Sequence, residues 1–141
     1  MLGYNFRLSD IHAALGRQQL KRLEQIMNKR TENANFYTAH INHSRVSTPR
    51  TTDQSVQAWH LYSLFLYNLP REKIKQHLQE NGIETGVYYP TPAYQQPFLH
   101  DLKQVELSRT EFAAQSVLQI PVHPKLKQSE LEHIVKIVNS L

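Results

Sequence analysis

The chain has 141 residues, of which 40% are hydrophobic and 20% charged, and its formal net charge is +4 at pH 7. This length predicts one domain-sized unit with a moderate core. There is no cysteine, which excludes disulfides and thiolate metal sites. No apolar run approaches the roughly 20 residues of a membrane helix, and the first residues lack a signal-peptide pattern. We therefore expect a cytoplasmic protein with no membrane partner.

From Ser9 to about Ile41 the chain contains no proline, and apolar residues recur at roughly helical spacing. This predicts one long helix, or two helices joined near Gly16, where glycine costs about 1 kcal/mol relative to alanine. We expect Gly16 to allow close packing against another element. An exposed apolar stripe on this helix is a further prediction.

The positive charge is densest on the same helix. Glu24 and Glu32 are interspersed among the cations of this helix. These cations are Arg17, Lys21, Arg22, Lys29 and Arg30. No aromatic residues alternate with them, as a base-stacking platform would require. We interpret the cluster as a solvated or interface face and expect no nucleic-acid partner. Nucleic-acid binding stays an alternative that rests on charge alone.

A polar segment, 42–57, leads into the second half of the chain. Residues 59–67 are aromatic and aliphatic, which predicts a mostly buried strand. Pro70 opens a helix that ends at Asn81-Gly82, and residues 83–89 predict another strand. Two helices follow, separated by a short segment at Ile120-Pro121. The order predicts an α+β fold, in which a long N-terminal helix precedes a small mixed or antiparallel sheet with helices on one face.

Side-chain patterns add detail to these elements. Each of the last two helices shows a capping box, formed by Ser108 with Glu111 and by Ser129 with Glu132. The predicted core includes Tyr37, Trp59, Phe65 and Phe112. His40 and His43 have metal-ligand spacing but no third ligand, so we expect no metal site.

The segment before the first helix holds the most informative pattern, Gly3-Tyr4-Asn5-Phe6-Arg7. It places an amide and a guanidinium beside a helix that Ser9 caps. Free backbone N–H groups at a helix N-terminus also favour anions. Together these donors predict an anion site suited to phosphate.

The chain resembles the C-terminal part of the DegT/DnrJ/StrS family of pyridoxal-phosphate-dependent sugar aminotransferases. The matching motifs occur in family order over nearly the whole chain: Gly3 to Asp10, Ala13 to Gly16, Gln19-Leu20, Trp59-His60-Leu61-Tyr62, Gly82-Ile83, Tyr89-Pro90-Thr91-Pro92, and Leu118 to Pro124. The resemblance implies the small C-terminal domain of a fold-type I aminotransferase. It also implies transfer of an amino group, usually from glutamate, to a keto group on a nucleotide-linked sugar.

The resemblance implies roles for single residues. In this family the asparagine of the Gly-Tyr-Asn loop reaches the cofactor phosphate of the partner subunit in a homodimer, and this role falls on Asn5. Arg7 is its companion for phosphate or substrate anions. Tyr89, Tyr94 and His60 are candidates for substrate contact. The alternative for the two tyrosines is simple packing of the loop, and the alternative for His60 is a core or interface histidine. The family commonly has histidine where this chain has Tyr94, and a phenol does not titrate near neutral pH.

The Schiff-base lysine of the family lies upstream of the Gly-Tyr-Asn loop and is absent here. Every lysine of the chain follows that loop: Lys21, Lys29, Lys73, Lys75, Lys103, Lys125, Lys127 and Lys136. We therefore expect the isolated chain to be inactive, without the large cofactor-binding domain. Residues 1–45 are interpreted as an active-site loop with a connecting helix, and 46–141 as the small α+β domain. The alternative is a non-catalytic remnant or interaction module that keeps this fold.

Overall fold

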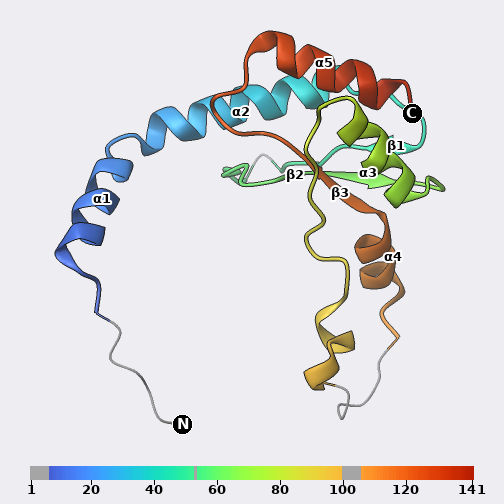
Figure 1. The fold of residues 1–141 in the computed structure, drawn as a ribbon, viewed down its shortest axis with the longest axis horizontal. Helices are drawn as coiled ribbons and strands as arrows, with labels where there is room; N and C mark the ends of the chain where they lie inside the picture. The colour runs from blue at the N-terminus through green and yellow to red at the C-terminus, as the bar shows by residue number, and fades with distance from the viewer. Residues whose placement is uncertain (1–6, 53, 100–105) are drawn as a thin grey trace.

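A computed structural model describes residues 7–52, 54–99 and 106–141. Figure 1 shows an N-terminal helical arm that extends away from a body of sheet and helices. The arm begins with α1 (Asp10–Leu20), and α2 (Leu23–His40) runs from the arm into the body. The start of α1 and the C-terminus therefore lie at opposite sides of the molecule (Figure 1).

The body is built on a three-stranded antiparallel sheet, in which β2 lies between the other two strands. Its strands are β1 (Val46–Ser47), β2 (Tyr62–Leu66) and β3 (Val117–Ile120). Burial alternates along β2, where residues 62, 64 and 66 are buried and residues 63 and 65 are half-buried. Such alternation places one face of the sheet on the core and leaves the other partly open.

Helices α2, α3 (Arg71–Glu80) and α5 (Gln128–Asn139) cover the core face of the sheet. They contribute buried side chains to one cluster with the sheet, including Tyr37, Leu64, Leu78, Leu118 and Val138. The short helices η1 (Ala93–Gln95) and η2 (Pro97–Leu99) and the helix α4 (Ser108–Ser116) lie beyond this cluster. The predicted α+β fold, with a small sheet and helices on one face, is confirmed.

One side of α2 bonds to backbone carbonyl groups of the body. Arg30 Nη1 donates to the oxygens of Trp59 at 2.6 Å and His60 at 3.0 Å. Asn33 Nδ2 donates to the oxygen of His123 at 2.9 Å, and the Tyr37 hydroxyl donates to that of Pro121 at 2.8 Å. We call Arg30, Asn33 and Tyr37 the α2 anchor. It fixes α2 to the segment that precedes β2 and to the segment that follows β3.

The long helix is divided, but not where the sequence indicated. α1 and α2 are separated by a turn at Lys21 and Arg22, and Gly16 lies inside α1. A Cβ built on Gly16 would meet nothing within 4 Å, so the expected close packing is not found among the described residues. The exposed apolar stripe is confirmed, because Ile11 is 74% and Leu15 59% exposed one turn apart on α1.

The strand predictions were partly wrong. Residues 83–89 form no strand and pair with the sheet only at Gly86, opposite Gln119. The predicted strand at 59–67 shrinks to residues 62–66, since Trp59 has a left-handed φ of 46° that interrupts extended backbone. β1 and β3 were not predicted.

The predicted caps and two of the predicted core residues also need correction. Ser108 is the first residue of α4 and makes no side-chain cap there. At α5 the Lys127 N–H donates to Glu130 at 2.7 Å, so the box at Ser129 was wrong by two residues. Phe112 is 43% exposed, and its ring lies tilted against that of Tyr67 outside the core. Phe65 is half-buried and lines a surface pocket, so it does not belong to the core cluster either.

Tyr37 makes the stability of this fold sensitive to alkaline pH. Burial raises the pKa of Tyr37 from the ordinary value of 10.0. The folded state therefore keeps a proton that the unfolded chain releases above pH 10, and the free energy of unfolding falls as pH rises through that range. We expect a shallower fall in Tyr37→Phe, measured by urea denaturation at several pH values. Tyr89→Phe, at an exposed tyrosine, should keep the wild-type slope.

Candidate active site

The arm presents one predicted phosphate ligand to solvent. Arg7 is exposed just before α1, and no hydrogen bond or ion pair of its side chain is found among the described residues. Ser9 caps α1, where its Oγ accepts from the His12 N–H at 3.4 Å and bonds to His12 Nδ1 at 2.8 Å. Asn5 lies outside the described residues. Among the described residues, the arm thus offers an unpaired guanidinium beside a helix N-terminus.

A second feature is a pocket of about 620 Å³ on the open face of the sheet. We call it the aromatic pocket, and its walls include Phe65, Tyr88, Tyr89, Gln96, Thr110 and Ala114. Tyr89 is 75% exposed, and its ring meets that of Tyr88 edge-on with centroids 6.0 Å apart. Apolar walls with a few polar side chains are typical of small-molecule sites. Sequence reasoning selected Tyr89 here but missed Gln96 and Thr110, which no motif distinguished.

Tyr94 joins two walls of the aromatic pocket. It lies on η1, and its hydroxyl donates to Glu111 Oε1 on α4 at 2.5 Å. Its neighbours Ala93 and Gln96 line the pocket on one side, and Thr110 lines it on the other. Tyr94 itself is not among the lining residues, so the structure gives it a bridging position.

The Tyr94 bond has a spectroscopic consequence. The hydrogen bond to the Glu111 carboxylate raises the pKa of the Tyr94 phenol. Glu111→Gln removes the negative charge and should lower that pKa, because the phenolate is then no longer opposed by a carboxylate. A tyrosine ring NMR titration would measure the shift. Glu132→Gln on α5 serves as the control and should leave the Tyr94 titration unchanged, whereas equal titration in both variants would contradict the prediction.

His60 belongs to a different cavity. It is exposed, and it lines a pocket of about 340 Å³ with Pro49, Arg50 and Gln57. Ser63 is shared between this pocket and the aromatic pocket. The predicted core alternative for His60 is therefore wrong, and the interface alternative stays a prediction. The structure brings Tyr89 and Tyr94 to one region, with His60 in the adjoining pocket that shares Ser63 and Arg7 just before α1.

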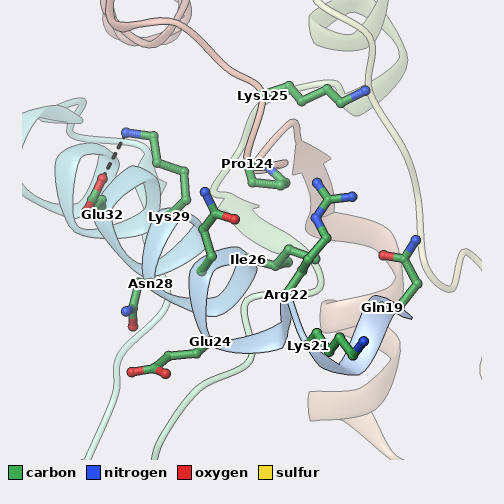
Figure 2. Close-up of a pocket in the computed structure, with 11 residues that line it drawn as sticks. Gln19, Lys21, Arg22, Glu24, Ile26, Asn28, Lys29, Glu32, Pro124 and Lys125 are labelled. Atoms are coloured by element: carbon green, nitrogen blue, oxygen red, sulfur yellow. Dashed lines mark hydrogen bonds and ion pairs between the residues drawn. The ribbon is translucent and has the colours of Figure 1, made fainter. Parts of the chain in front are cut away.

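Another pocket, of about 820 Å³, lies where α1 meets α2 (Figure 2). Arg22 extends across it toward the chain at Pro124, and Lys29 pairs with Glu32 at 2.8 Å. Lys125 approaches from the body. Arg30 is turned to carbonyl groups instead, so the cations predicted to share one face are divided between two environments.

The two histidines with metal-ligand spacing are engaged with backbone oxygens. His40 Nδ1 bonds to the Phe36 oxygen at 2.8 Å, and His43 Nε2 bonds to the Leu141 oxygen at 2.7 Å. Within the described ranges no three His, Asp or Glu side chains are grouped to hold a metal ion. In the same part of the chain, none of the helices is long and apolar enough to cross a membrane.

Solved structures identify the class to which this architecture belongs. DesV of S. venezuelae, determined with a ketimine intermediate, superposes with a TM-score of 0.90 at 26% identity, covering 99% of this chain and 38% of that one. PseC of Helicobacter pylori, an aminotransferase of pseudaminic acid biosynthesis, gives 0.89 at 26% identity, over 99% and 39%. The fold is that of the C-terminal part of sugar aminotransferases.

The sequence comparison makes this assignment more specific. Residues 1–139 match the model of the DegT/DnrJ/EryC1/StrS aminotransferase family, and the chain belongs to this family. A Campylobacter jejuni UDP-4-amino-4,6-dideoxy-N-acetyl-β-L-altrosamine transaminase is 32% identical over 94% of the chain and 36% of its own length. An Aneurinibacillus thermoaerophilus dTDP-3-amino-3,6-dideoxy-α-D-galactopyranose transaminase is 29% identical over 97% and 37%. The chain thus spans little more than a third of these relatives.

Aminotransferases of this family depend on pyridoxal 5'-phosphate. The described residues fit one part of that cofactor. An unpaired guanidinium at Arg7, near the N-terminus of α1, suits a phosphate group. Asp10, in the first turn, is the nearest acidic residue in sequence and does not pair with Arg7. The arm is therefore suited to the phosphate end of the cofactor.

Proposed function

We propose that this chain forms the C-terminal part of a pyridoxal-phosphate-dependent aminotransferase that acts on a keto group of a nucleotide-linked sugar, with glutamate as amino donor. The observation that carries the proposal is the family match over residues 1–139. We assign residues 1–45 to a cofactor-site loop with its connecting helix, and 46–141 to the small domain. The complete enzyme would be a cytoplasmic homodimer.

In this proposal the arm of one subunit serves the active site of its partner. Asn5 and Arg7 would hold the cofactor phosphate and so orient the bound cofactor. The exposed apolar residues Ile11 and Leu15 on α1 would be covered in the same assembly, since the described part of the chain leaves them without a partner. An arm that reaches away from its own body is suited to this role.

The substrate would meet the small domain at the aromatic pocket. Tyr89 offers an exposed ring for a sugar face and a hydroxyl for hydrogen bonding. Tyr94 holds the pocket walls through Glu111 and His60 lies at the border, where it could contact the substrate. The cofactor supplies the electron sink for breaking a C–H bond next to nitrogen. The residues of this chain would bind and orient the substrate and the cofactor.

The decisive experiment is to translate the DNA upstream of Met1 and in the neighbouring genes. We expect a cofactor domain with the family's lysine, and co-production with it should give a protein that aminates a nucleotide-linked keto sugar. A co-produced, folded complex without this activity would overturn the enzymatic proposal.

A second candidate is a non-catalytic interaction module. It is favoured by the lysines of the chain, none of which lies in the family's Ser-x-x-Lys setting. The purified chain should then give no borohydride-reducible adduct with pyridoxal phosphate at a single lysine. A saturable adduct at one site would count against this candidate.

A further inference from the structure

Gln119 has more hydrogen-bonding partners than its place on β3 requires. It is 4% exposed, and its backbone pairs with Ser63 on β2 in the sheet register. On the other side its N–H donates to the Gly86 oxygen at 2.9 Å, and its own oxygen accepts from the Gly86 N–H at 3.1 Å. This residue is the only point at which the described segment 83–89 pairs with the sheet.

The side chain of Gln119 holds Tyr88, which lies two residues after Gly86 in the same segment. Its Oε1 accepts from the Tyr88 N–H at 2.9 Å, and its Nε2 lies 3.5 Å from the Tyr88 oxygen. Nε2 also donates to Ser63 Oγ at 3.1 Å. The amide thus binds both polar groups of one residue's backbone, as a neighbouring strand would. The Gln119 side chain therefore takes the place of the backbone hydrogen bonds that an adjacent strand would make to Tyr88.

The residue held in this way stands between two cavities. Tyr88 lines the aromatic pocket and also a pocket of about 260 Å³ that includes Gly86 and Gln119. Its ring folds back over Gly86, where a Cβ would lie 2.7 Å from Tyr88 Cε2. The same ring meets Tyr89 edge-on. Tyr88 and Tyr89 are 54% and 75% exposed, so few other contacts fix them.

We propose that Gln119 is a positioning residue for the tyrosine pair: it fixes the Tyr88 backbone and thereby sets the Tyr89 ring in the aromatic pocket. Its amide does this through acceptor and donor together, which neither a carboxylate nor an apolar side chain reproduces. The consequence for ligand binding rests on the proposed function, in which Tyr89 contacts a nucleotide sugar. The positioning of the Tyr89 ring by Gln119 does not rest on the proposed function.

The test uses the 141-residue chain with labelled tyrosine. Gln119→Leu should raise the hydrogen-exchange rate of the Tyr88 amide about fivefold, as expected when a hydrogen bond worth about 1 kcal/mol is lost. It should also weaken the Overhauser effect between the Tyr88 ring and Gly86. Gln119→Glu keeps the acceptor for the Tyr88 N–H but loses the donor near the Tyr88 oxygen, so its protection should lie between those of the wild type and Gln119→Leu. Unchanged exchange and ring contacts in Gln119→Leu would overturn the inference.

A second variant keeps the inference falsifiable if Gln119→Leu does not fold. Gly86→Ala leaves the glutamine in place but displaces the Tyr88 ring, because the added methyl occupies its position. It should preserve the Tyr88 amide protection while the Tyr88–Tyr89 ring contact is lost. Loss of that protection in Gly86→Ala would contradict a role for Gln119 in holding the backbone.

A ligand titration separates this inference from the proposed function. UDP-N-acetylglucosamine and dTDP-glucose are titrated while the ring resonances of Tyr88 and Tyr89 are followed. Chemical-shift changes that are seen in the wild-type chain and are at least about threefold weaker in Gln119→Leu support both the positioning by Gln119 and the substrate contact of Tyr89. Lost ring geometry with unchanged shifts, or no shifts in any variant, would overturn the substrate contact of Tyr89 and leave the positioning by Gln119 supported.

Discussion

Leu64→Ala is expected to lower the free energy of unfolding by about 3–5 kcal/mol. Leu64 is fully buried at the centre of β2, the middle strand of the sheet, so its removal leaves a cavity that flanking strands cannot easily fill. Since domains are stable by only about 5–15 kcal/mol, this one change would remove a large share of the total. Urea denaturation followed by circular dichroism measures it.

The matched control for this variant is Leu15→Ala on α1. Leu15 is 59% exposed and α1 has no buried residue, so the same chemical change should alter the free energy of unfolding by less than about 0.5 kcal/mol. Similar losses in both variants would mean that α1 packs on the body of the chain. Their difference therefore also tests whether the arm is independent of the core.

Arg7→Ala should weaken cofactor binding about 10- to 100-fold in the enzyme assembled with its cofactor domain. The expected loss corresponds to about 1.5–3 kcal/mol, the usual contribution of hydrogen bonds to a charged group. Arg7→Lys keeps the charge but loses the fork of donors, so its affinity should be intermediate. Fluorescence titration with pyridoxal phosphate provides the measurement.

Arg17→Ala is the control for a general effect of charge. Arg17 is another exposed cation of the arm, placed in the last turn of α1 and away from its N-terminus. It should bind the cofactor as the wild type does. Equal loss of cofactor affinity in Arg7→Ala and Arg17→Ala would indicate long-range electrostatic attraction. Unchanged affinity in Arg7→Ala would exclude Arg7 from the phosphate site.

The class of fold and the main helices could be predicted because strong local signals mark them. Pro70 and Asn81-Gly82 bracket α3 closely, and Gly82 has the positive φ of 75° that such a C-terminus requires. β3 was missed for the opposite reason. Ser116 ends α4 and Val117 begins β3 with no glycine or proline between them, so neither of these residues marks the change of structure in the sequence.

The site was harder to predict, because its geometry depends on contacts between distant segments. Tyr89 and Tyr94 were found through a local motif, yet the bond from Tyr94 to Glu111 spans 17 residues. Gln119 gave no signal, since a polar residue within a strand usually faces solvent. Only the approach of segment 83–89 from outside the sheet shows why an amide is buried there.

The α2 anchor has an evolutionary consequence. Arg30, Asn33 and Tyr37 bind carbonyl oxygens, which every amino acid possesses, and not the side chains of the segments they hold. Residues at positions 60 and 123, which line separate pockets, can therefore be exchanged without loss of their attachment. Such an arrangement lets cavity chemistry diverge rapidly over an unchanged framework, and it identifies these two positions as sites for engineering new selectivity.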